Sequence, residues 1–218
     1  EKPVKEEAIG MNVVLTIDAG LQKKISEVLM RRLALSSSAK GATAVAIEPA
    51  TGEILALVTI PSYDNNMFST PSARQEYQRM ERSALNPFFN RAISGMYPPG
   101  SVIKPFVAYA ALEEGVVTPR TQVMSTGSIV IPNPYNPDAP AVFRDWKAGG
   151  HGIVDIYKAI AESVNTYFYA IGGGYGDISG LGVLRIKKYL DAFGFGTKTN
   201  IDIMGEGAGV VPNQEWKE

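Results

Sequence analysis

The pattern of apolar and polar positions predicts short strands that alternate with helices of moderate length. Residues 13–17 are predicted to form a strand, and Asp18 is a good N-cap for a following helix. Apolar residues at helical spacing mark the face of this helix that is expected to be buried, namely Leu21, Ile25, Val28 and Leu29. Residues 43–60 predict a hairpin around a turn at 48–52. Its two runs are almost continuously apolar, so both faces of these strands are expected to be covered.

Irregular segments separate the remaining predicted elements. Residues 61–90 form a polar excursion with a helix predicted from about 69 through Glu81, typical of a solvated flap or an insertion. Residues 128–131 and 141–144 could pair as a hairpin around a proline-rich loop.

Three helical segments are predicted in the last third of the chain. One begins after Asp155, a second resumes after an interruption at 163–165, and a third covers 181–190 and ends at Gly194. None of the apolar runs is long enough to span a bilayer.

The most informative stretch runs from Pro98 to Gly115. Two prolines and a glycine interrupt the preceding structure, and a helix-forming run follows at once and ends at Gly115. Ser101 is therefore expected near the helix N-terminus, with Lys104 one turn later on the same face. Pro105 is tolerated there, because the first turn has no intrahelical partner for its missing N–H.

A serine beside a lysine at a helix start can support nucleophilic catalysis. A serine hydroxyl is a weak nucleophile until an adjacent base takes its proton. A lysine can be that base when burial and neighbours lower its pKa. The free N–H groups of the helix start also favour negative charge on an attacked carbonyl. The alternative is an ordinary serine and a solvated lysine, because so short a motif also occurs by chance.

Ser163 and Asn165 form a second candidate pair, in the interruption between two helical segments. The Ser163 hydroxyl could relay a proton, and the Asn165 amide could bind a substrate carbonyl and steady a lysine. The alternative is helix capping, which local reasoning favours because both residue types are good at helix starts.

The composition excludes several classes of function. The 218 residues are 45% hydrophobic with a formal net charge of −1, which describes a globular chain without a basic patch. Nucleic acid is therefore not an expected partner. The chain has no cysteine, which excludes disulfides and thiol chemistry and makes a zinc site harder to build.

Several short motifs occur together along nearly the whole chain. Ser-x-x-Lys at 101–104 followed by Ser-x-Asn at 163–165 is part of the signature of active-serine penicilloyl enzymes. Other matching segments are Leu-Thr-Ile-Asp at 15–18, Thr-Gly-Glu-Ile-Leu-Ala at 51–56, Pro-Ser-Tyr-Asp at 61–64, Asn-Arg-Ala at 90–92, Tyr-Pro-Pro-Gly-Ser at 97–101, Gly-His-Gly at 150–152 and Phe-Gly-Phe-Gly at 193–196. With these motifs the chain resembles the class B penicillin-binding proteins. Arg-Asp-Trp-Lys at 144–147 favours their elongation, or rod-shape, branch.

The resemblance implies an α+β fold of the penicillin-binding-protein and β-lactamase-like type, an antiparallel sheet flanked by helices. Residues 1–11 would be a linker or the end of a preceding module. Residues 12–218 would be the N-terminal part of the transpeptidase domain, incomplete at the C-terminus. The family's third motif, Lys-Thr/Ser-Gly on a strand, is missing. Lys-Thr-Asn at 198–200 lacks its glycine.

The resemblance also implies roles by position. Ser101 would be the acylated nucleophile and Lys104 its base. Ser163 would pass a proton to the leaving group, and Asn165 would hold the substrate amide and Lys104. The implied activity is that of a peptidoglycan D,D-transpeptidase in cell-wall synthesis and cell-shape maintenance, acting on D-Ala-D-Ala stem peptides through a serine acyl-enzyme. β-Lactam antibiotics would mimic the donor, and no cofactor is expected.

Further implications concern partners and location. Membrane cell-wall synthesis proteins, such as a glycosyltransferase, are expected partners. The catalytic domain is expected to face the periplasm or extracellular side of a bacterial cell membrane, held by a single-pass anchor absent from this chain. The segment alone is expected to be inactive. A β-lactam-binding sensor, a non-catalytic scaffold of a cell-wall complex and a serine β-lactamase remain alternatives.

Metal binding is not expected. Some relatives hold zinc nearby with an acidic residue and a cysteine at positions that read Ser125 and Val164 here. Asp145 and His151 remain, but zinc needs three or four protein ligands. His151 is therefore predicted to be a structural histidine that makes hydrogen bonds.

Overall fold

The computed structural model describes residues 10–133, 136 and 138–217. Residues 1–9, most of the predicted linker, lie outside this described part. The chain divides into two compact units, one of residues up to 96 with 203–207, the other of 97–202 with 208–218. Helices and two-stranded antiparallel sheets make up both units, in agreement with the α+β class. No helix in the described ranges has the length and apolarity needed to cross a membrane.

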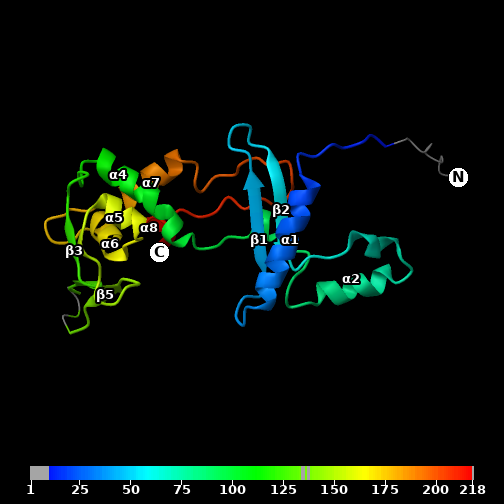
Figure 1. Ribbon diagram of the computed structural model, residues 1–218, viewed down its shortest axis with the longest axis horizontal. Helices are drawn as coiled ribbons and strands as arrows, with labels where there is room; N and C mark the ends of the chain where they lie inside the picture. The colour runs from blue at the N-terminus through cyan, green and yellow to red at the C-terminus, as the bar shows by residue number, and fades with distance from the viewer. Residues whose placement is uncertain (1–9, 134–135, 137, 218) are drawn as a thin grey trace. The chain divides into compact units, whose positions relative to one another are not determined.

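In the first unit, helix α1 packs along a hairpin of two strands (Figure 1). The elements are α1 (Ala19–Ala34), β1 (Ala42–Ile47), β2 (Ile54–Ile60), the 3-10 helix η1 (Asn65–Ser69), α2 (Ala73–Glu81) and α3 (Arg91–Ser94). Val45 lies opposite Leu57 in the antiparallel pair, which confirms the hairpin. Asp18 caps α1 as predicted, because its carboxylate accepts the Leu21 N–H at 2.8 Å.

The strand predicted at 13–17 does not form. The side-chain amide of Gln22 donates to the backbone C=O of Leu57 and accepts its N–H, each at 2.8 Å. The Thr16 hydroxyl donates to the Ile54 C=O at 2.7 Å. These side chains, together with the backbone N–H of Asp18, which donates to the Leu55 C=O at 2.9 Å, therefore satisfy backbone groups of β2 that a third strand would have needed.

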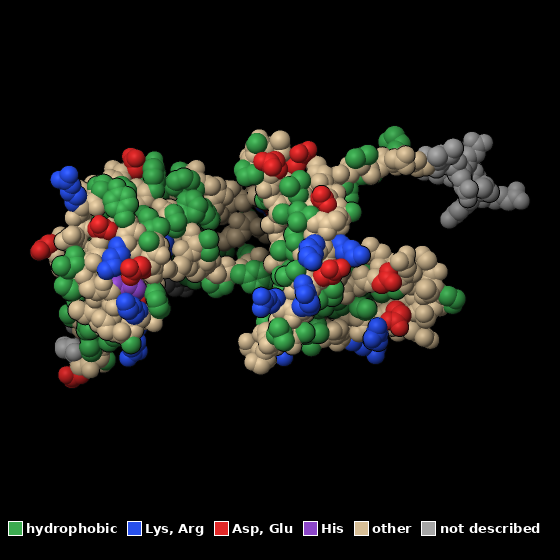
Figure 2. Space-filling model, in the orientation of Figure 1, with side chains coloured by type: hydrophobic (Ala, Val, Ile, Leu, Met, Phe, Trp, Pro, Cys, Tyr) green, Lys and Arg blue, Asp and Glu red, His purple; other side chains and the backbone are tan. Residues whose placement is uncertain are grey.

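Burial around the hairpin is lower than the apolar pattern predicts. No residue of α1 is buried, and Leu21 and Val28 of its predicted buried face are exposed. Val45 and Ile47 of β1 are also exposed. The expectation that both strands are covered on both faces is wrong for β1, because the helices that contact the hairpin, α1 and the short α3, leave part of it bare. Hydrophobic side chains are visible on the surface in Figure 2.

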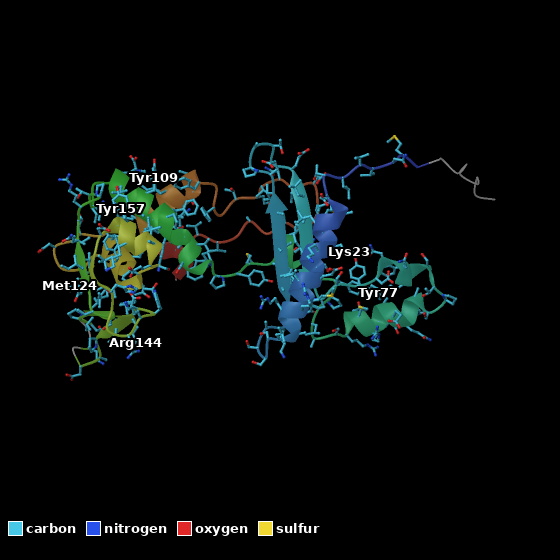
Figure 3. All side chains as sticks on the ribbon, viewed as in Figure 1. Lys23, Tyr77, Tyr109, Met124, Arg144 and Tyr157 are labelled. Atoms are coloured by element: carbon cyan, nitrogen blue, oxygen red, sulfur yellow. The ribbon has the colours of Figure 1, made fainter. Side chains whose placement is uncertain are left out.

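The polar excursion contains a cluster of aromatic rings. Tyr63 lies edge-on to Phe88 at 4.8 Å between ring centroids, and Phe88 stacks on Tyr77 at 5.2 Å. Figure 3 labels Tyr77 on α2. Helix α2 begins at Ala73, a few residues later than predicted. The excursion therefore has apolar packing of its own.

The second unit is a helical core with two small ribbons. Its elements are η2 (Gly100–Ile103), α4 (Lys104–Glu113), β3 (Val123–Ser125), β4 (Ser128–Ile131), β5 (Ala141–Arg144), β6 (Gly152–Val154), α5 (Ile156–Ala161), α6 (Asn165–Gly173), α7 (Gly182–Ala192) and α8 (Gln214–Lys217). Helix α6 lies at the centre, where Tyr167, Ala170 and Ile171 are fully buried. Helices α4, α5 and α7 all contact it.

Most elements of this unit agree with the predictions. Ile129 of β4 lies opposite Phe143 of β5, which confirms the second hairpin. Asp155 caps α5 by accepting the Lys158 N–H at 2.9 Å. The pairing of β3 with β6 was not predicted, because strands of three residues are too short to show a period.

Candidate active site

Ser101 lies in the 3-10 turn η2, which runs directly into α4. The Lys104 N–H donates to the Ser101 C=O, so η2 and α4 form one continuous helical start. Pro105 occupies the first turn of α4, as predicted. The Ser101 side chain is exposed, which leaves its hydroxyl accessible to a substrate.

Lys104 is buried, and its amine is fully hydrogen-bonded. Nζ donates to the C=O of Ser163 at 2.7 Å, to the hydroxyl of Ser163 at 3.0 Å and to Oδ1 of Asn165 at 2.6 Å. The ring of Phe168 lies 5.3 Å from Nζ. Three of the four predicted site residues thus meet at one point. Within the described part of the chain, no hydrogen bond joins the Ser101 hydroxyl to Lys104.

These three contacts are compatible with a neutral amine. The Ser163 C=O and the Asn165 amide oxygen can only accept, whereas the Ser163 hydroxyl can accept or donate. A neutral Lys104 could keep two N–H bonds and turn its lone pair to a hydroxyl. Burial lowers the pKa of Lys104, although the charge of Asp145 opposes this shift. The surroundings therefore favour the neutral base more than water does.

Ser163 has a backbone conformation that is rare for a residue with a side chain. Its φ of 53° lies in the left-handed region. The flanking backbone bonds, Ser163 N–H to Ile160 C=O at 3.2 Å and Val164 N–H to Ala159 C=O at 2.9 Å, hold the turn closed. Such a conformation costs about 1–3 kcal/mol and persists only when its surroundings enforce it. In this conformation both the C=O and the hydroxyl of Ser163 reach Lys104.

The helix-capping interpretation of Ser163 and Asn165 is wrong. The N-cap of α6 is Val164, which has no side-chain oxygen, and Asn165 is the first helical residue. Oδ2 of Asp145, from a loop distant in sequence, accepts the Thr166 N–H at 2.9 Å and the Thr166 hydroxyl at 3.0 Å. Because Asp145 caps the helix, the other two side chains are free to contact the buried lysine.

A chain of hydrogen-bonded polar side chains lies next to the 163–165 turn, and the sequence predicts only its histidine. Nδ1 of His151 lies 2.6 Å from Oε2 of Glu162, and its Nε2 lies 3.3 Å from Oδ1 of Asp145. The His151 and Asp145 side chains are almost completely buried. The prediction of a hydrogen-bonding structural histidine is confirmed. Glu162 was missed, because a glutamate at a helix end is normally solvated.

Both carboxylates in this chain are stabilised in the charged form. Burial would raise the pKa of Asp145, but hydrogen bonds from the N–H and hydroxyl of Thr166 and from the Trp146 N–H outweigh it and hold the pKa below its ordinary value. The hydrogen bond to His151 lowers the pKa of Glu162. Both groups are therefore ionised at neutral pH.

Comparison with known proteins identifies the family. Residues 42–218 match the penicillin binding protein transpeptidase domain. The chain belongs to this family. It is 40% identical over 209 residues to the peptidoglycan D,D-transpeptidase MrdA of Haemophilus influenzae and 34% identical over 209 residues to MrdA of Escherichia coli K12. Each alignment covers 96% of this chain but only 29% and 30% of those relatives, so the chain spans less than a third of their length.

Solved structures of the transpeptidase family have the same fold. PBP2 of Pseudomonas aeruginosa in complex with WCK 5153 is 40% identical, with a TM-score of 0.74, over 94% of this chain and 42% of that one. PBP2 of Helicobacter pylori in complex with MreC is 32% identical, with a TM-score of 0.76, over 92% and 34%. These similarities confirm the resemblance to the elongation-type penicillin-binding proteins and the expected fold class.

The donor set of this family member does not fit a zinc ion. The buried hydroxyl of Ser125 is 2.8 Å from that of Thr166, and the Val164 side chain offers no ligand atom. Asp145 and His151 are hydrogen-bonded to each other. Across the residues that the structure describes, no group of three or more His, Cys, Asp or Glu side chains is arranged to hold a metal.

The Lys-Thr-Asn segment at 198–200 does not lie on a strand. It follows α7 in an irregular, exposed loop, in which Asn200 has a φ of 62°. This placement agrees with the expectation that the segment does not supply the transpeptidase family's third motif.

Proposed function

We propose that this chain carries the acylation machinery of a peptidoglycan D,D-transpeptidase, with Ser101 as the nucleophile. The observation that supports this most strongly is the contact of Lys104 with both Ser163 and Asn165 at the start of the helix that Ser101 precedes. Family membership supplies the reaction class, and the buried lysine supplies a base with a lowered pKa.

The first step is acylation. The Ser101 oxygen attacks the carbonyl of the penultimate D-Ala, and neutral Lys104 takes the hydroxyl proton. Because Nζ is bonded to the 163–165 turn in the structure, Lys104 must exchange one of those bonds for the Ser101 hydroxyl. The bond to the terminal D-Ala then breaks. Ser163 passes a proton to the leaving amine and recovers one from Lys104, and Asn165 holds the substrate amide.

The second step transfers the acyl group. The amine of a neighbouring stem peptide attacks the Ser101 ester and gives up one proton, which Lys104 accepts. A new amide bond forms, the bond from the acyl carbon to the serine oxygen breaks, and Lys104 returns the proton to that oxygen. A β-lactam follows only the first step, because its opened ring stays attached as an ester of Ser101.

The proposal extends to the place of this chain in a larger protein. Residues 12–218 would be the N-terminal part of the transpeptidase domain, preceded by a linker or the end of another module at 1–11. Further strands with the Lys-Thr/Ser-Gly motif would complete the domain. A single-pass anchor would hold it at the bacterial cell membrane, facing the periplasm or the extracellular side. Cell-wall synthesis proteins such as a glycosyltransferase would be its partners. Support comes from solved relatives, which include a complex of PBP2 with MreC and a peptidoglycan synthase complex.

Other functions predict different kinetics after acylation. A β-lactam sensor or scaffold would keep its acyl group and would not turn over stem peptides. A serine β-lactamase would lose the acyl group quickly. A deacylation time course with a fluorescent penicillin, followed by a cross-linking assay on stem peptides, separates the three.

The assignment of Ser101 is tested by mass spectrometry. The full-length protein is treated with penicillin and digested with trypsin, and the adduct is expected on the peptide that contains Ser101. The variant Ser101→Ala is expected to be unlabelled. An adduct on Ser163, or labelling that persists in Ser101→Ala, would overturn the assignment.

A further inference from the structure

We propose that the hydrogen-bond network around His151 holds the 163–165 turn in its strained shape, so that Asp145, His151 and Glu162 are positioning residues for acylation. This inference rests on the proposed function. Its premise is structural: the network consists of the buried side chains of His151 and Asp145 with the more exposed Glu162, and it contacts the residue on each side of the turn.

Part of the network is a closed ring. The backbone N–H of His151 donates to the backbone C=O and to the hydroxyl of Ser125, each at 3.2 Å. The Ser125 hydroxyl is 2.8 Å from the Thr166 hydroxyl, which donates to Asp145 at 3.0 Å. Oδ1 of Asp145 lies 3.3 Å from Nε2 of the His151 imidazole, and this contact closes the ring of hydrogen bonds. Because each member has two connections, the ring is rigid and specifies one arrangement.

The ring is connected to both ends of the turn. Thr166 directly follows Asn165, and its N–H is capped by Asp145. Glu162 directly precedes Ser163, and its carboxylate is bonded to the ring nitrogen of His151. The turn is therefore held from the α5 side and from the α6 side by the same histidine–aspartate pair.

The strain at Ser163 gives this connection a consequence for chemistry. A left-handed serine returns to an ordinary conformation when its surroundings loosen. Relaxation would move the C=O and hydroxyl of Ser163 away from Lys104, whose three hydrogen bonds all go to this turn. Since an error of about 1 Å in the position of a catalytic group can cost about a hundredfold in rate, loss of the network should slow acylation.

The test compares disruptive, conservative and control variants in the full-length protein. His151→Ala and Glu162→Ala break the connection on the α5 side. Glu162→Gln keeps an oxygen that can accept from His151. Glu114→Ala is the matched control, because it removes a carboxylate of the same unit that accepts from Lys188 at 2.8 Å and does not touch the turn.

Three quantities are measured with a fluorescent penicillin: the acylation rate constant at saturation, the half-saturating concentration and the labelled fraction. His151→Ala and Glu162→Ala are expected to lower the rate constant about ten- to a hundredfold with the labelled fraction unchanged. Glu162→Gln is expected to restore most of the rate, and Glu114→Ala to leave it at the wild-type value. A purely structural role would lower the labelled fraction and leave the rate constant unchanged. That result, or wild-type rates in both disruptive variants, would overturn the proposal.

Hydrogen exchange separates failure of this inference from failure of the proposed function. In Glu162→Ala, the peptide that contains 162–168 is expected to exchange faster than in the wild type and in Glu114→Ala. If the wild-type protein is not acylated at Ser101, the proposed function fails, but exchange still reports on the turn. Unchanged exchange in Glu162→Ala would overturn the positioning role by itself.

Discussion

At the scale of single residues, Lys104 combines burial with three acceptors on one turn. The variant Lys104→Ala is expected to slow acylation by about a hundredfold to ten-thousandfold, the usual cost of losing a general base. The measurement is the rate of penicillin labelling, with thermal melting as the control for folding. Lys187→Ala, at a half-buried lysine paired with Asp191, should label normally. Normal labelling of Lys104→Ala would show that this lysine is structural.

The lowered pKa of Lys104 predicts how acylation depends on pH. The proposed base is the neutral amine of Lys104, so the rate should rise with pH, and the rise should begin at lower pH than for an exposed lysine. The unfolded chain binds this proton more tightly than the folded chain does. Stability should therefore also rise with pH between the folded pKa and the ordinary lysine value. A pH–rate profile of labelling is the measurement, and a rate that does not change through the alkaline range would contradict the role.

Tyr167 has a hydroxyl that makes no hydrogen bond within the described part of the chain. Its side chain is fully buried, its hydroxyl has no partner among the described residues, and burial raises its pKa to about 12. Tyr167→Phe should therefore leave stability unchanged or raise it by about 1 kcal/mol. Tyr189→Phe is the comparison, because that hydroxyl donates to Glu114 at 2.9 Å and its loss should lower the melting temperature. The measurement is the melting temperature of both variants. A lower melting temperature for Tyr167→Phe would show that the Tyr167 hydroxyl has a hydrogen-bond partner after all.

At the scale of elements, the glycines before His151 differ in what surrounds them. Gly149 and Gly150 both have positive φ, but only at Gly150 would a Cβ meet the backbone of Ser125 and Gly127. Gly149→Ala should lose about 1–2 kcal/mol from conformation alone. Gly150→Ala should lose more and should also slow acylation, because it pushes His151 away from Ser125. Equal melting temperatures for the two variants would contradict this close approach.

The elements that can be predicted from the sequence are those with local signals. Asp18 and Asp155 are predictable as caps, because one side chain and the following turn determine each cap. The strand at 13–17 was mispredicted because Gln22, a residue of the next helix, satisfies the edge that the strand would have used. No local signal reveals such a contact.

The candidate site shows the same division. The motifs pointed to Ser101, Lys104, Ser163 and Asn165, and the last three do converge. Glu162 cannot be predicted from the sequence as a site residue, because its partner is a histidine on another segment and its own surroundings are those of a solvated helix end. Helix capping was favoured for the 163–165 turn because the capping carboxylate, Asp145, is remote in sequence.

At the scale of the whole molecule, the first unit has little core. Its hairpin has two strands, and within the described ranges β1 pairs only with β2 and exposes Val45 and Ile47. A two-stranded hairpin is at best marginally stable, and an apolar edge favours aggregation. Residues 1–218 alone are therefore predicted to be poorly stable and not to turn over substrate.

Expression of residues 1–218 alone and of the full-length protein provides the measurement. Denaturant titration and penicillin labelling are compared between the two. We expect a cooperative transition and labelling only in the longer protein. A cooperative transition together with full-rate acylation in the short one would show that the domain ends earlier than proposed.

The position of Trp146 gives the network a built-in optical probe. Its indole lies edge-on to the His151 ring, 5.2 Å between centroids, and its Nε1–H donates to the Glu162 C=O at 3.2 Å. The sequence has only one other tryptophan, Trp216, so Trp216→Phe would leave a single fluorophore at this site. Emission intensity would then report, without any attached dye, whether the histidine and the end of α5 keep their places while a β-lactam enters and reacts.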